Sequence, residues 1–456
     1  MAGLGPGAAA EVPAITLTEQ AKPRGVGRGG TTPMKRLNKI ALLCSLCLAA
    51  TPQAFGQAQN DFARDRDLGV LDRPRPEYDA LGMPVSTFLM YPRLNVVTGY
   101  NDNIFAQDTG AQGAGFVQLQ PSVALRSQWS QHELDALAHA SINRYFDRST
   151  ENTDDYGASL NGRLDVLTST KLTAGGSYDL ETESREAETS LRNTISPVQF
   201  GLWTAQMSGS RQFNRLQVSL SGTFDSFNYL DGRDPLTNAV VDEHYRNVQD
   251  FGETLRADYA LSPDTALFVS GNLNQHTYSI VPPLVPKNFG SHGYEMLGGV
   301  NFQITSLVTG EVGIGYYQQS YPHIQNQDTS GFALHGTVQW FPTELTTVTL
   351  KVNRFIQDSA IQTSAGYVDT GGSFEVDHEL RYNVILSGMF SYNNDSYQGI
   401  DRTDERWTAG VGAKYLFTRE VGVGLNFNHD SQVSSGANRF INFDINRVML
   451  NLVLQK

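Results

Sequence analysis

The sequence predicts an all-β protein, a transmembrane antiparallel up-and-down β-barrel of about 18 strands (roughly 16–20), behind a short periplasmic N-terminal extension. Three observations predict this fold. An export signal lies near the N-terminus, apolar and polar residues alternate along most of the remaining chain, and the connections between alternating runs are by turns short and long. Each part of the chain is considered below in sequence order.

Residues 34–56 have the layout of a secretory signal peptide. Lys35 and Arg36 precede the apolar run IALLCSLCLAA, and AFG ends the segment in a small-x-small pattern. The run is too short for a membrane-spanning helix, which needs about 20 apolar residues; a buried helix or a retained anchor is the alternative interpretation. Residues 1–33 are rich in Gly, Ala and Pro, and we interpret them as an over-extended start before Met34.

The export signal also holds both cysteines, Cys44 and Cys47, so the mature chain has none. This excludes a disulfide scaffold and thiolate metal sites. Removal of residues 1–56 takes away six of the 34 bases and two of the 47 acids, so the net charge changes from −13 to −17. An acidic exported chain is a poor candidate for nucleic-acid binding, and we expect no nucleic-acid partner.

Residues 57–86 form the predicted periplasmic extension, which includes RPRPEYDALG (73–82). Its prolines favour extended backbone and resist pairing in a central strand, so we expect a stiff lead-in to the first strand. We further expect Arg73 and Arg75 to pair with acids at the barrel mouth. The segment would then lie partly in the lumen as a periplasmic gate.

Residues 87–455 alternate with the period of two that is typical of strands with one apolar and one polar face, as in LQVSLSGTF (216–224). Most of the runs exceed ten residues, whereas soluble strands average about five or six and a tilted membrane-spanning strand needs about 9–11. A soluble sandwich shows the same alternation, but the strand length favours the bilayer. The predicted strands are 87–100, 115–129, 132–146, 154–168, 170–183, 197–211, 214–229, 250–261, 264–279, 291–305, 307–320, 330–341, 344–356, 367–380, 382–396, 404–417, 419–431 and 439–455.

The connections alternate between short turns such as 168–170 and 262–264 and long loops such as 181–196, 231–250 and 277–292. Short periplasmic turns and long outer loops indicate a bacterial outer-membrane barrel. An even number of strands places both termini in the periplasm. Aromatic clusters near the strand ends fit interfacial girdles, although core aromatics would look the same.

Polar residues on the faces opposite the apolar ones are the candidates for lining the lumen. A base directed at lipid near the midplane costs roughly 2–4 kcal/mol, so these side chains should point inward. Mutual pairing as structural struts explains them as well as a role in selectivity does. The candidates are Asn161, Arg163, Asp165, Arg256, Asp258, Glu311 and Lys351.

Catalytic, cofactor and metal motifs find no support in the sequence. Glycine-rich GEVGIGY (310–316) lies inside an alternating run with no helix after it, the nine histidines form no HExxH, and no GxSxG is present. We therefore expect neither catalysis nor a cofactor. The acidic stretches 150–156 and 100–105 could hold calcium, but Asp and Asn are ordinary turn residues, which is the favoured interpretation, and we predict no metal site.

Four stretches, RPRPEYDALG (73–82), YPRLNVVTGYNDNIF (91–105), LQPSVALRSQWSQHEL (119–134) and NRVMLNLVLQ (446–455), resemble the putative beta-barrel porin type 2 family. This resemblance covers about residues 70–455. It implies an outer-membrane β-barrel of a Gram-negative, mainly alphaproteobacterial, cell, without catalytic residues and often linked to surface-polysaccharide export. The end LVLQK lacks the terminal aromatic of many such barrels, which bears on recognition by the barrel assembly machinery.

Two functions fit this predicted barrel. The first is a porin-like channel and conduit for exported surface polysaccharide, with cation preference because the chain is acidic. The alternative is a structural or assembly protein that anchors or organises the surface glycan without an open pore. The expected partners are outer-membrane lipid, lipopolysaccharide, polysaccharide export machinery and barrel assembly machinery. A siderophore-type receptor is disfavoured, because the short extension cannot form a plug domain of at least about 50 residues.

Overall fold

The structure is a computed structural model, and it describes residues 68–187, 190, 194–281, 288–324, 328–359 and 363–456. The predicted signal peptide (34–56), residues 1–33 and the first part of the extension (57–67) lie outside the described residues. Among the described residues, no helix is both long and apolar enough to cross a membrane.

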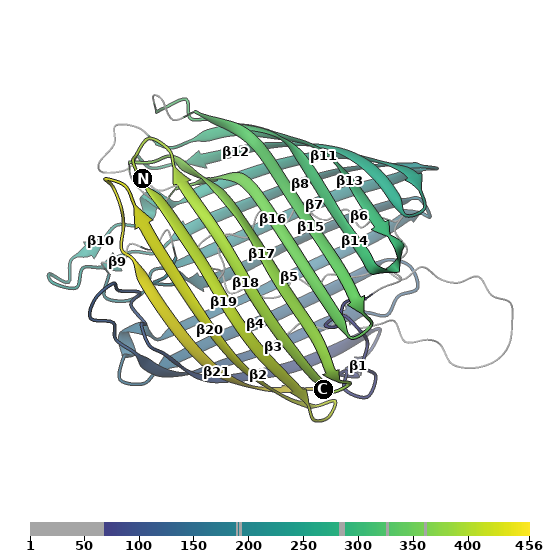
Figure 1. Cartoon of the computed structure of the whole chain (residues 1–456), viewed down its shortest axis with the longest axis horizontal. Helices are drawn as coiled ribbons and strands as arrows, with labels where there is room; N and C mark the ends of the chain where they lie inside the picture. Colours follow the sequence, from purple (N-terminus) through teal and green to yellow (C-terminus); the bar gives the residue numbers. More distant parts are fainter. Residues whose placement is uncertain (1–67, 188–189, 191–193, 282–287, 325–327, 360–362) are drawn as a thin grey trace, which may run out of the picture.

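Eighteen antiparallel strands form one closed barrel, as predicted (Figure 1). Each pairs with the strand before and after it, β8 pairs with β11, and the barrel closes where β2 pairs with β21. The strands are β2 (Phe88–Asn101), β3 (Ala114–Ser127), β4 (Glu133–Tyr145), β5 (Thr153–Leu167), β6 (Thr170–Thr182), β7 (Gln199–Phe213), β8 (Leu216–Tyr229), β11 (Val248–Ser262), β12 (Thr265–Tyr278), β13 (Ser291–Ile304), β14 (Val308–Ser320), β15 (Thr329–Thr343), β16 (Thr346–Asp358), β17 (Gly366–Arg381), β18 (Val384–Tyr397), β19 (Thr403–Leu416), β20 (Val421–Ser435) and β21 (Phe443–Gln455).

Five short elements lie outside this wall. They are β1 (Met83–Val85), the hairpin β9 (Gly232–Arg233) and β10 (Val240–Val241) in the β8–β11 loop, and single-turn 3₁₀ helices at Ser149–Glu151, His244–Arg246 and Thr305–Leu307. β1 pairs with the start of β2. The sheet therefore begins a few residues before the predicted boundary at residue 87.

The period of two separates an apolar outer face from a polar inner face. On β5, Leu160 and Leu164 are 53% and 54% exposed, while Asn161 between them faces the interior. On β21, Leu452 is exposed while the neighbouring Asn451 is 1% exposed. Large apolar side chains on the outside and polar ones inside are the reverse of a soluble protein, because here the outer face meets lipid.

The two ends of the barrel differ in their connections. At the short-turn mouth the connections are 128–132, 168–169, 214–215, 263–264, 305–307, 344–345, 382–383 and 417–420. At the long-loop mouth they are 102–113, 146–152, 183–198, 230–247, 279–290, 321–328, 359–365, 398–402 and 436–442. The C-terminus and β1 lie together at the short-turn mouth (Figure 1).

Residues 69–80, called the mouth segment below, are folded rather than extended, so the prediction of a stiff extended lead-in is wrong. The amide of Asp72 donates to the carbonyl of Gly69 (2.9 Å), and that of Tyr78 donates to the carbonyl of Arg75 (2.7 Å). Pro76 occupies the second position of the latter turn, where its fixed φ is favourable. Proline thus shapes a turn here instead of an extended strand.

Candidate functional site in the barrel lumen

Three of the predicted lumen residues form one ion-paired cluster on the inner wall. Arg256 on β11 bonds Asp258 two residues later at 2.8 Å and reaches Glu311 on β14, also at 2.8 Å. Its guanidinium carbon lies 4.0 Å from the centroid of the Phe268 ring on β12. The cluster crosses four neighbouring strands, so it braces the inner wall at the same time as it places charge there.

The remaining predicted lumen residues divide into a second cluster and a separate base. Arg163 on β5 pairs with Glu133 on β4 at 2.7 Å and with Asp165 at 3.1 Å. Asn161 accepts a hydrogen bond from the amide of Gln206 on β7 (3.3 Å). Lys351 on β16 is exposed, on the same face as the buried Thr349. The structure therefore brings six of these seven residues into networks and leaves Lys351 exposed on the inner wall.

At the long-loop mouth, strand ends approach each other across the lumen. His276 Nδ1 on β12 lies 2.7 Å from Asp250 Oδ1 and 3.1 Å from Asp358 Oδ2 at the end of β16. β12 and β16 are four strands apart, about 19 Å along the wall. The contact is possible because β15 stops pairing with β16 at Arg354, while β16 and β17 pair up to Asp358. The end of this strand pair therefore leaves the wall and narrows the lumen.

The β6–β7 loop is fixed to distant parts of the same mouth by buried ion pairs. Arg185 bonds both carboxylate oxygens of Glu151 in the β4–β5 loop at 3.0 Å. Glu186 accepts two hydrogen bonds, at 2.7 and 2.9 Å, from Arg447 on β21, which is five strands from β6. The loop therefore lies over the lumen instead of projecting away from the membrane.

A third buried arginine joins the β6–β7 and β8–β11 loops. Arg246 bonds Glu183 and also lies 3.5 Å from Glu243, and all three side chains are almost completely buried. The guanidinium packs on the Tyr229 ring, 4.1 Å from its centroid. Burial raises the pKa of Glu243 to about 7, against the opposing effect of Arg246. Buried aromatics, among them Phe200, surround this group and complete the apolar packing of the mouth.

At the opposite, short-turn mouth, Arg75 is the central contact of the mouth segment. Its side chain is 1% exposed and pairs with Glu379 on β17 at 2.7 Å. It also donates to the carbonyls of Tyr382 and Val70, both at 3.0 Å. Arg73 instead donates to the carbonyl of Leu68 (3.2 Å), and no carboxylate of the described residues lies within ion-pairing distance of it.

Three further hydrogen bonds hold the mouth segment to the barrel. The amide of Val70 donates to Thr347 Oγ1 on β16 (2.8 Å), and Arg419 in the β19–β20 turn donates to the carbonyl of Pro76 (2.9 Å). Gln455, at the end of β21, donates to the carbonyl of Tyr78 (3.3 Å). The segment therefore spans the inner edge of the short-turn mouth from β16 to β21.

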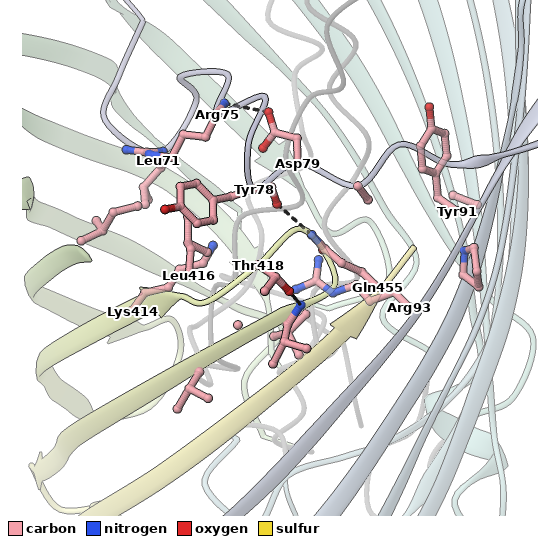
Figure 2. A pocket seen from close by; sticks show the side chains of 18 of the residues that line it. Leu71, Arg75, Tyr78, Asp79, Tyr91, Arg93, Lys414, Leu416, Thr418 and Gln455 are labelled. Carbon is pink, nitrogen blue, oxygen red and sulfur yellow. Dashed lines mark hydrogen bonds between the residues drawn. The ribbon is translucent and has the colours of Figure 1, made fainter. Parts of the chain in front are cut away.

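A cavity, called the short-turn cavity below, lies between the mouth segment and the inner wall (Figure 2). The segment contributes Arg75, Tyr78 and Asp79 to its lining. The wall contributes residues of β2, β3 and β18–β21, among them Arg93 and Lys414. Charged groups and tyrosines thus line the space where a solute would pass between the segment and the wall.

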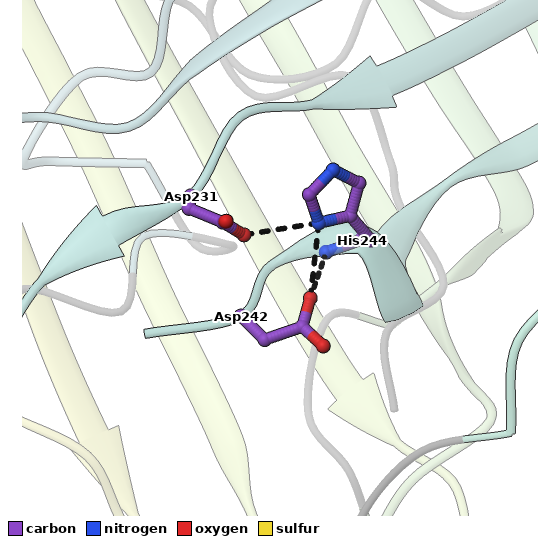
Figure 3. A group of neighbouring side chains, drawn as sticks. All are labelled: Asp231, Asp242 and His244. Atoms are coloured by element: carbon purple, nitrogen blue, oxygen red, sulfur yellow. Dashed lines mark hydrogen bonds and ion pairs between the residues drawn. The ribbon is translucent and has the colours of Figure 1, made fainter. Parts of the chain in front are cut away.

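Two groups of acids were considered as cation sites. Among the described residues, Asp231, Asp242 and His244 in the β8–β11 loop bring their ligand atoms within 4.8 Å of one another. Figure 3 shows the histidine between the two acids, with Nδ1 at 3.0 Å from Asp231 and 3.1 Å from Asp242. The hydrogen bond with Asp242 raises the pKa of His244, and this exposed ion-paired group needs no metal to explain its geometry.

The two stretches weighed as calcium loops have protein partners for their carboxylates. Glu151 pairs with Arg185, and Asp154 pairs with Arg144. In the other stretch, Asp102 accepts hydrogen bonds from the backbone and side chain of Asn446 (both 2.7 Å). These contacts favour the interpretation of both stretches as ordinary turns and loop anchors.

Sequence reasoning missed the groups that narrow the long-loop mouth, namely Arg185, Arg246, His276, Asp358 and Arg447. Most of their contacts join distant segments, and no local motif marks such pairs. One signal was available for Arg447, because it occupies an inner-face position opposite the outward Leu450. The period of two therefore predicts the face of this arginine but not its partner.

The fold, the apolar outer face and the polar lumen define a porin-like outer-membrane β-barrel. The sequence family described as "Putative beta-barrel porin 2" matches residues 75–456, and the chain belongs to this family. The expected family and the outer membrane of a Gram-negative bacterium as its location are thereby confirmed. Membership of a porin family points to a channel and not to an enzyme.

Several solved outer-membrane proteins are similar in fold, at low sequence identity. A BenF-like porin from Pseudomonas fluorescens Pf-5 has 10% identity and a TM-score of 0.46, covering 82% of this chain and 100% of that one. The outer membrane protein opdK from Pseudomonas aeruginosa has 10% identity and a TM-score of 0.41, covering 80% and 99%. The siderophore receptor PirA from Acinetobacter baumannii has 7% identity and a TM-score of 0.47, covering 80% of each chain. No curated protein matches the sequence.

Proposed function

We propose that the barrel is a channel for hydrophilic solutes with a preference for cations. The observation that carries the proposal is a closed barrel of 18 strands with a polar inner wall, since barrels of about 16–18 strands enclose an aqueous lumen. Acids outnumber bases in the half of the inner wall nearer the long loops. They include Asp155, Asp179, Asp225, Asp250, Glu295, Asp369, Asp395 and Asp430. Acidic side chains around a pore favour cations.

Reconstitution in planar bilayers tests this proposal. We expect stepwise conductance and, under a KCl gradient, a reversal potential of the sign that indicates cation selectivity. The double substitution Asp179→Asn and Asp225→Asn should reduce the selectivity. Asp444→Asn, at an exposed position on the outer face, is the matched control and should not. An absence of conductance, or anion selectivity, would contradict the proposal.

We also propose that the short-turn mouth faces the periplasm, with both termini there, and that the mouth segment gates the channel through Arg75. The buried Arg75–Glu379 pair and the hydrogen bonds to β16 and β21 support this role. Deletion of residues 57–82 should raise the single-channel conductance. If the conductance is unchanged, the segment is only a leader.

Export of surface polysaccharide is the more specific form of the channel proposal. The hydroxyl- and amide-bearing side chains of the inner wall, such as Gln217 and Asn272, suit a sugar polymer that needs hydrogen-bonding walls. Under this proposal the partners are lipopolysaccharide, barrel assembly machinery and polysaccharide export machinery, and the protein has no enzymatic role. A deletion strain that loses its surface glycan while small-solute uptake persists would support it, and the reverse phenotype would favour a general porin.

The alternative proposal, a structural or assembly protein without an open pore, draws on a different observation. The loops at the long-loop mouth are joined by the buried pairs Arg185–Glu151, Arg246–Glu183 and Arg447–Glu186. A closed, non-conducting barrel whose deletion still releases the surface glycan from the cell would support this alternative.

A further inference from the structure

The short-turn cavity carries more basic than acidic side chains in a chain that is acidic overall. Arg93 of β2, Arg126 of β3 and Lys414 of β19 line it from the wall. The lining carboxylate is Asp79, whose Oδ2 accepts a hydrogen bond from the backbone amide of Arg75 (2.7 Å). The Arg75 side chain pairs outside this set, with Glu379. Three bases against one acid attract an anion to this cavity.

Arg126 lies closer to the cavity lining than to its acidic neighbour. It is directly cross-strand from Asp135, yet neither carboxylate oxygen of Asp135 has a hydrogen-bond partner among the described residues. The buried Arg126 Nε also has none there. The guanidinium carbon lies 5.9 Å from the ring centroid of Tyr91, another lining residue. Arg126 is therefore placed to donate hydrogen bonds to a ligand in the cavity.

We propose that the short-turn cavity binds the carboxylate of a small acidic sugar. A guanidinium presents paired N–H donors that match the two oxygens of a carboxylate, and Lys414 adds a point charge. Tyr78 and Tyr91 offer an apolar ring face and a hydroxyl beside these cations, which suits the mixed polarity of a sugar ring.

The position of the cavity gives such a ligand contact with both the gate and the wall. The mouth segment supplies Arg75, Tyr78 and Asp79, whereas Arg93, Arg126 and Lys414 belong to barrel strands. A ligand that binds only when both sides are in place shifts the population toward the docked segment. The bound sugar therefore favours the closed state of the short-turn mouth.

Calorimetric titration of the full mature chain in detergent with D-galacturonate tests the proposal, and neutral D-galactose is the matched ligand. We expect binding of galacturonate and not of galactose, with an affinity that falls as salt is added. Arg126→Gln and Lys414→Gln should each weaken binding about tenfold, because each removes a charged hydrogen-bond donor. Lys351→Gln, which removes an inner-wall base outside the cavity, should leave the affinity unchanged.

Equal binding of galactose and galacturonate would overturn the proposal, as would wild-type affinity in both cavity variants. Inorganic phosphate that competes as well as galacturonate would overturn the assignment to a carboxylate. Circular dichroism checks that the variants keep the barrel, and Arg126→Lys, which retains the charge without the paired donors, should bind with intermediate affinity. The titration requires no ion flow, so a failure of the channel proposal and a failure of this one are separate results.

Discussion

The two mouths of the barrel are held by different arrangements of the same kind of bond. At the long-loop mouth, Arg185, Arg246 and Arg447 each join a loop to another loop or strand. At the short-turn mouth, one fully buried arginine, Arg75, joins one segment to one strand. Several independent bonds make the first mouth redundant, whereas the second depends on a single side chain. The short-turn mouth is therefore the end that a single event can open.

The largest expected effect is at the long-loop mouth, from Arg246→Ala. This substitution leaves the buried Glu183 and Glu243 without their shared cation, which should cost about 5 kcal/mol of local stability. Hydrogen exchange in residues 230–247 should rise while exchange in the strands stays low. Arg233→Ala, at an exposed position in the same loop, is the control and should have little effect. Unchanged protection in Arg246→Ala would remove the basis for the comparison.

The next effect is Arg75→Ala at the short-turn mouth, where one carboxylate, Glu379, loses its partner. We expect a loss of about 3 kcal/mol, near the low end for a broken buried pair. Because the segment has few other anchors, protease should cleave residues 68–82 while the barrel remains intact on gels. Arg73→Ala removes only a hydrogen bond to a carbonyl and should be cleaved much more slowly. Equal cleavage of both variants would show that the segment does not depend on Arg75.

A smaller effect is the pH dependence of the long-loop mouth. The pKa of Glu243 is raised to about 7 from an ordinary value near 4.5, so the folded loop binds this proton more tightly than the unfolded loop. Local stability should therefore fall as pH rises from about 4.5 to 7, by at most about 1.4 kcal/mol per pH unit. Hydrogen exchange of residues 230–247 between pH 5 and about 8 measures this. Glu243→Gln should remove this slope, and a slope that persists would assign it to another group.

The smallest expected effect comes from an ion pair on the outer surface of the long-loop mouth. Arg144 and Asp154 are 2.6 Å apart, but their side chains are 45% and 64% exposed. Arg144→Ala should change the free energy of unfolding by less than about 0.5 kcal/mol, because exposed pairs contribute little. Thermal unfolding of the purified protein measures this. A loss comparable to that of Arg246→Ala would mean that burial does not set the strength of these pairs.

The sequence predicted the fold well because lipid and water impose the alternation on every strand. Leu160 and Leu164 must face outward and Arg163 inward wherever the strand lies, so each run of residues reports its own orientation. The strand ends were predicted to within a few residues for the same reason, since the alternation stops where the chain leaves the wall. The predicted lumen residues Arg163 and Arg256 lie on the expected face.

The lumen contacts were less predictable because they join residues that no local pattern connects. Arg447 and Glu186 are 261 positions apart, and Arg75 and Glu379 are 304 apart. The mouth segment shows the same limit, because the proline pattern of RPRPEYDALG fits both an extended chain and a turn. Its conformation is decided by partners such as Thr347, 277 positions away.

The seam between β2 and β21 determines how the chain can be cut and rejoined. Arg93 near the start of the barrel pairs with Gln455 at its end, so the two chain ends of the wall are neighbours. A short linker could join them, and new ends could be opened at a tight turn such as 214–215 without breaking any strand pair. A circular permutant of this kind would separate the mouth segment from the wall that it contacts. The order in which the strands are synthesised would then become a variable independent of the finished barrel.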